Sequence, residues 1–163
     1  MGRLTVELIP RTLFFSNVRT LLPKKYWNII RKDSYDKAEN KCEICGDTGK
    51  NQGYRHNVEC HEIWNYDEEK RIQKLLGLIS LCPKCHQVKH FGRTSAIGKQ
   101  AEAFKHMEKV NNWNHKECVD HLRVAMSEWM ERSKYQWFID LSYLNEKYEI
   151  PKKLINEAEK KRK

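Results

Sequence analysis

The stretch Ser80–His90, "SLCPKCHQVKH", carries the most specific chemistry in the sequence. Cys82 and Cys85 form a Cys-x-x-Cys pair, and Cys42 and Cys45 ("CEIC") form a second pair upstream. Two such turns deliver the four soft ligands that tetrahedral zinc prefers. A closed set of four sulfurs leaves no open position, so the pattern predicts a structural zinc. This zinc would hold the start of the central segment against the start of a helix.

Composition narrows the class of protein. The chain has 163 residues, of which 39% are hydrophobic and 33% charged, so its least apolar segment needs help from a metal. The net charge of +9 indicates a polyanionic partner, most commonly nucleic acid. We recognise no secretory signal, and the apolar run Leu75–Ile79 is far too short to cross a bilayer. We therefore expect a cytoplasmic protein whose cysteines bind metal rather than form disulfides.

The central segment, residues 41–92, predicts a strand–strand–helix order. "YRHNVECHEIWNY" (54–66) and "RIQKLLGLISLC" (71–82) have the pattern of two strands joined by the charged turn "DEEK". "PKCHQVKHF" is typical of a helix that begins at Pro83. The expected fold class is α+β.

The flanks, residues 1–40 and 93–163, are expected to be mainly helical. Residues 22–41 predict a helix with Pro23 near its start, and residues 114–133 predict another whose Asn114 and Glu117 form a capping box. Alternation over residues 3–11 favours a short strand, and residues 136–144 favour a last strand that could pair with it. The chain ends in a basic tail.

The histidines beside the cysteines need a separate explanation. His86 and His90 lie one helical turn apart, on one face of the predicted helix, where they could share a cation. The alternative is that both are ordinary surface residues. His61, in the "VECHEIW" strand, would be brought against this helix by the hairpin and the zinc. A neutral imidazole beside a metal is a suitable general base for activating water.

Together, "CEIC", "ECHEIW" and "LCPKCHQVKH" resemble an HNH endonuclease of the ββα-metal class, in the subset with a four-cysteine zinc. The resemblance covers residues 41–92 and implies a phosphodiesterase acting on DNA. It implies that His61 is the general base and that His86 and His90 bind a catalytic divalent cation: Mg²⁺, Mn²⁺, Ni²⁺ or Zn²⁺. The flanks also resemble those of uncharacterised bacterial proteins with this module.

Two positions depart from the family. Cys60 stands where the family usually has a histidine or aspartate ligand; it either binds a softer metal or does not bind, and we favour the second. The family's central asparagine, which commonly orients the general base, would fall near Gly77. A backbone carbonyl, Asn65 or Glu62 would then have to orient His61.

Basic residues surround the predicted catalytic helix, and those expected to contact the nucleic-acid backbone are Lys84, Lys89 and Arg93. The expected function is metal-dependent cleavage of DNA. Two alternatives remain: a non-catalytic zinc-dependent nucleic-acid-binding module, and a toxin-like or phage-defence nuclease activated by a protein partner through the helical flanks.

Overall fold

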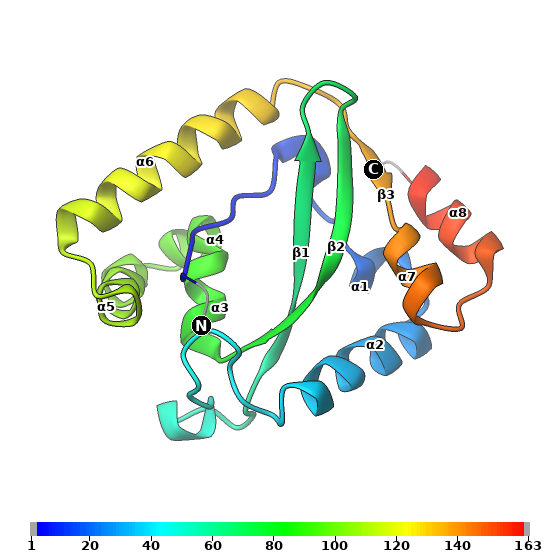
Figure 1. Ribbon diagram of the computed structural model, residues 1–163. Helices are drawn as coiled ribbons and strands as arrows, with labels where there is room; N and C mark the ends of the chain where they lie inside the picture. Colours follow the sequence, from blue (N-terminus) through cyan, green and yellow to red (C-terminus); the bar gives the residue numbers. More distant parts are fainter. Residues whose placement is uncertain (1–2, 162–163) are drawn as a thin grey trace.

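A long β-hairpin forms the centre of the computed structural model, which describes residues 3–161 (Figure 1). Strands β1 (Glu59–Asp67) and β2 (Ile72–Leu81) are antiparallel, as predicted, with an irregularity in the register between Ile63 and Trp64. The short strand β3 (Phe138–Asp140) pairs in parallel with β2, so the sheet order is β1-β2-β3.

The helices lie around this sheet, so the fold of the described residues is α+β. Their bounds are η1 (Arg11–Leu13), α1 (Val18–Leu21), α2 (Lys24–Lys37), η2 (Lys50–Gln52), α3 (Pro83–Lys89), α4 (Phe91–Ala96), α5 (Gln100–Asn111), α6 (His115–Arg132), α7 (Ser142–Lys147) and α8 (Lys152–Lys160). Two predicted starts are confirmed. Pro83 occupies the first turn of α3, where its missing N–H costs nothing, and α6 has the Asn114–Glu117 capping box.

Buried apolar side chains form two hydrophobic clusters. The cysteine-side cluster lies between β2, α3, α5, α6 and the N-terminal segment, and it contains Leu4, Val6, Cys42, Ile44, Leu81, Cys82, Cys85, Val88, Phe91, Ala103, Met107, Cys118 and Ala125. The second cluster, here the terminal-helix cluster, contains Leu13, Val18, Leu21, Leu22, Ile30, Leu75, Trp137, Ile139, Leu141, Leu144, Ile150, Ile155 and Ala158. Each cluster draws on both flanks and on the central segment.

The N-terminal segment, residues 3–10, corrects one prediction. It is not assigned as a strand and does not pair with β3, whose partner is β2. Figure 1 shows it running between α6 and the hairpin. Its backbone groups form hydrogen bonds with side chains of α5 and α6 in place of a neighbouring strand. Within residues 3–161, no helix is long and apolar enough to cross a membrane.

Candidate metal centres

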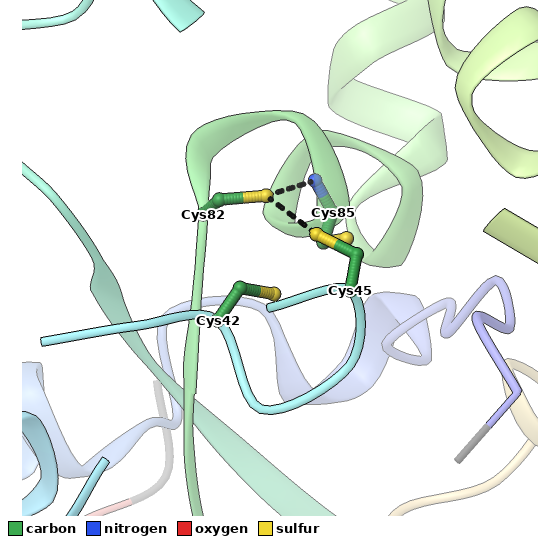
Figure 2. A group of neighbouring side chains, drawn as sticks. All are labelled: Cys42, Cys45, Cys82 and Cys85. Carbon is green, nitrogen blue, oxygen red and sulfur yellow. Dashed lines mark hydrogen bonds between the residues drawn. The ribbon is translucent and has the colours of Figure 1, made fainter. Parts of the chain in front are cut away.

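The four cysteines of the two Cys-x-x-Cys pairs converge, as predicted (Figure 2). Their sulfur atoms all lie within 4.8 Å of one another, and Cys45 Sγ lies 3.6 Å from Cys82 Sγ. Four sulfurs bound to one tetrahedral zinc, each at about 2.3 Å, would be about 3.8 Å apart. Both the donor set and its spacing therefore fit a structural zinc.

Local structure explains how each pair is shaped. Gly46 follows Cys45 with a φ of 75°, and its N–H donates to the carbonyl of Cys42 at 2.8 Å, so the first pair curls into a tight turn. In the second pair, Cys82 caps the N-terminus of α3 and its sulfur accepts the N–H of Cys85 at 3.5 Å. The backbone thus directs sulfurs from two distant stretches to one point.

The pKa values of the thiols show why this cluster favours a cation. The hydrogen bond with Cys45 lowers the pKa of Cys42 to about 6, although the hydrogen bond with Cys82 opposes it, and the hydrogen bond with Cys42 lowers the pKa of Cys82. The hydrogen bonds with Cys42 raise the pKa values of Cys45 and Cys85. Four thiolates this close cannot all be ionised without a compensating charge, which a divalent ion would supply. His106 of α5 adds a contact from outside, since its Nε2 lies 3.2 Å from Cys85 Sγ.

A second cluster consists of His61 from β1, His86 from α3, and His90, which directly follows α3. One ring nitrogen of each lies within 4.8 Å of the others, and the ring centroids are 4.6 to 5.3 Å apart. Burial lowers the pKa of His90 to about 3, helped by the charges of His86 and His61. Burial also lowers the pKa of His61, although Glu7 opposes it. His61 and His90 are therefore neutral near pH 7, with lone pairs available for a metal or a proton.

In two of these rings, one nitrogen forms a hydrogen bond with a carboxylate. Glu59 accepts a hydrogen bond from His86 Nδ1, which leaves Nε2 as the nitrogen that can bind a metal. Glu7 accepts from His61 Nε2 at 2.8 Å, which leaves Nδ1 as the nitrogen that can take a proton. Carboxylate partners of this kind fix the tautomer and the orientation of an imidazole.

Glu7 is the site residue that sequence reasoning missed. Burial would raise its pKa, but the hydrogen bond from His61 and the charge of Lys89 outweigh burial and lower it to about 2. None of the groups proposed from the sequence takes this place. Glu62 instead accepts the N–H of Val18 at 2.7 Å. The sequence around Glu7 contains no local signal for this role, because only the tertiary fold brings it to His61.

The two departures noted in the sequence lie away from the histidine cluster. Cys60 contacts Ser34 of α2, and burial raises its thiol pKa to about 12. Because successive side chains of a strand point to opposite faces, Cys60 lies on the face opposite His61. Gly77 pairs with Ile63, whereas the partner of His61 is Ile79. Neither Cys60 nor Gly77 belongs to the two metal-ligand groups found among residues 3–161.

The three basic residues expected to contact nucleic acid differ in exposure. Lys84 and Arg93 are exposed. Lys89 is buried, and its Nζ donates to Glu7 Oε1 at 2.6 Å and to Thr5 Oγ1 at 2.9 Å. The ammonium of Lys89 therefore neutralises a carboxylate inside the protein, where a nucleic-acid phosphate would have to displace Glu7 to reach it.

Comparisons with protein-family models, with curated proteins and with solved structures find no match for the chain. The residues themselves must therefore support any functional assignment.

Proposed function

We propose that the chain is a metal-dependent endonuclease of the HNH type, which hydrolyses phosphodiester bonds in DNA through a water activated by His61. The observation that carries this proposal is the convergence of three histidine side chains where β1 meets α3, with carboxylates on the outer nitrogens of His61 and His86. Such an arrangement supplies both a metal site and a neutral base within one cluster.

In this proposal, two of the histidines bind the metal and the third acts as the base. His86, through Nε2, and His90 would hold a divalent cation. Imidazole ligands suit Zn²⁺, Ni²⁺ and other transition ions. When bound, the cation would offset the charge that develops on the phosphate and on the leaving 3′ oxygen. His61 takes the proton of the attacking water on Nδ1, while Glu7 stabilises the imidazolium that results.

Charge around the cluster supports a polyanionic substrate. The chain carries a net charge of +9, and Lys84 and Arg93 are exposed on α3 and α4. These side chains can neutralise backbone phosphates, so binding should weaken as salt concentration rises.

Cleavage of supercoiled plasmid by zinc-loaded protein tests the proposal, with Mg²⁺, Mn²⁺, Ni²⁺ or Zn²⁺ added in parallel and an RNA substrate alongside. His61→Ala should abolish metal-dependent cleavage. The matched control is His115→Ala, which removes an exposed imidazole that contacts Glu108 and Phe104. Equal cleavage by wild type and His61→Ala would indicate a contaminating nuclease. Retained DNA binding without cleavage under any metal would instead favour a zinc-dependent binding module.

A further inference from the structure

The N-terminal segment reaches the histidine cluster because two C-terminal helices hold it there. Asn111 of α5 binds Leu4 twice, accepting its N–H at 2.8 Å and donating to its carbonyl at 2.7 Å. On α6, His121 Nε2 accepts the N–H of Val6 at 2.9 Å. These contacts satisfy backbone groups that a neighbouring strand would otherwise satisfy.

Two more contacts complete the support. Trp129 of α6 donates its indole N–H to the carbonyl of Ile9 at 2.9 Å, and the N–H of Glu7 donates to the carbonyl of Lys89 at 3.0 Å. Backbone contacts therefore flank Glu7 on both sides in the chain. Its side chain has little freedom to leave the space between β1 and α3.

Both carboxylate oxygens of Glu7 are engaged. Oε1 accepts from the buried ammonium of Lys89 at 2.6 Å, and Oε2 contacts His61 Nε2 at 2.8 Å. A carboxylate that faces an ammonium can only accept hydrogen bonds, so Nε2 must be the protonated nitrogen of the neutral His61 ring. The lone pair of that ring is then on Nδ1.

We propose that Glu7 is the positioning residue of His61, which it holds in the Nε2–H tautomer, and that α5 and α6 act on the site by holding the segment that carries Glu7. The catalytic part of this inference rests on the proposed function, whereas the tautomer can be measured without any cleavage. The helical flanks then have a defined role: they deliver a carboxylate to the hairpin from a position far away in the sequence.

Glu7→Gln is the sharpest test, because Lys89 dictates how the new amide must turn. The ammonium of Lys89 can only donate, so it binds the amide oxygen and turns the NH₂ group towards His61. That NH₂ group also donates, so Nε2 must become the acceptor and the proton must move to Nδ1. The substitution keeps the shape of the side chain yet reverses the tautomer.

The measurement is ¹⁵N NMR of histidine-labelled full-length protein carrying its structural zinc, above the ordinary histidine pKa of about 6.5. A His61→Gln spectrum assigns the signals of His61. We expect protonated Nε2 in the wild type and protonated Nδ1 in Glu7→Gln. In the cleavage assay, kcat should fall by about 10²- to 10⁴-fold with KM changed by less than about twofold, as when a general base loses its correct tautomer. Thr5→Val, which removes the other hydrogen bond of Lys89, should leave tautomer and kcat unchanged.

If Glu7→Gln fails to fold, as judged by zinc content and circular dichroism, Glu7→Leu/Lys89→Met removes both polar partners together. That variant should show a mixture of His61 tautomers. The inference is overturned if His61 keeps a protonated Nε2 and an unchanged kcat without Glu7. A wild type that never cleaves, while its tautomer still depends on Glu7, would remove the proposed function and leave the positioning role intact.

Discussion

We expect that removing a metal bound by the four clustered cysteines would unfold one hydrophobic cluster and spare the other. Three of these four cysteines, Cys42, Cys82 and Cys85, are buried members of the cysteine-side cluster. The terminal-helix cluster contains no cysteine among its described members. A strong chelator should therefore release α3 and α5 while α2, α7 and α8 stay folded against the sheet.

The magnitude follows from what each cluster buries. The cysteine-side cluster includes four cysteines and two alanines, which are small, whereas the terminal-helix cluster consists mainly of large aliphatic side chains. Each buried Leu or Ile side chain contributes about 1.5–3 kcal/mol, and a cysteine or alanine contributes less. Binding of a structural zinc is worth about 10–16 kcal/mol near pH 7, which matches or exceeds the total stability of about 5–15 kcal/mol of a typical domain. The cysteine-side cluster should therefore not persist without the metal.

Hydrogen–deuterium exchange with mass spectrometry, before and after chelation, separates the two clusters. Peptides from α3 and α5 should lose protection, and peptides from α2 and α8 should keep most of theirs. Cys45→Ser should reproduce the effect of the chelator. Cys118→Ser, which changes a buried cysteine outside the zinc site, is the control and should leave zinc content unchanged. Uniform loss of protection across all these helices would refute the division into a metal-dependent and a metal-independent part.

Three further substitutions test other parts of the molecule. Cys60→Ser should leave both cleavage and metal preference unchanged in a plasmid assay, because its side chain lies on the sheet face opposite His61; an altered metal preference would instead make Cys60 a ligand. Burial raises the pKa of Glu62 from 4.5 to about 7, so its own contribution to stability should fall by about 3 kcal/mol as pH rises through this range. The lowered pKa values of His61 and His90 act with the opposite sign in wild type and variant alike, so the difference in urea-unfolding free energy between wild type and Glu62→Gln isolates Glu62. Parallel pH curves for the two proteins would contradict the assignment. Trp129→Phe keeps an aromatic ring but removes the hydrogen bond to the carbonyl of Ile9, which is worth about 1 kcal/mol. If that energy holds Glu7 in place, kcat should fall roughly fivefold. An unchanged kcat would show that α6 does not act on the site.

The sequence predicted those features of the structure that depend on residues close together in the chain. Alternating residues and a charged turn predicted the hairpin, and Pro83 predicted the start of α3. The doubled Cys-x-x-Cys pattern predicted the cysteine cluster, because each turn shapes its own pair of ligands. The helical spacing of His86 and His90 likewise predicted that they share a face, which their contact confirms.

Prediction was wrong where a partner comes from far along the chain. Residues 3–10 alternate as a strand would, but alternation reports only which side chains are buried. It does not report what binds the backbone, and here the side chains of Asn111, His121 and Trp129 do so. The partner of β3 was predicted wrongly for the same reason. Its short sequence specifies neither its partner strand nor its direction, and it pairs with β2.

The contact between Glu7 and His61 depends both on the locally predictable hairpin and on partners from far along the chain. The position of Glu7 between an ammonium and an imidazole depends on a segment that cannot fix its own conformation, because its backbone lacks a sheet to join. The helices that fix it are α5 and α6, in which Asn111 and His121 bind backbone groups that lie 107 and 115 residues earlier in the chain. A hairpin and α3 alone would bring His61 to His86 and His90, but they would leave its outer nitrogen without this carboxylate. Helices α5 and α6 therefore complete the environment of a single imidazole, whereas α2, α7 and α8 pack in the terminal-helix cluster.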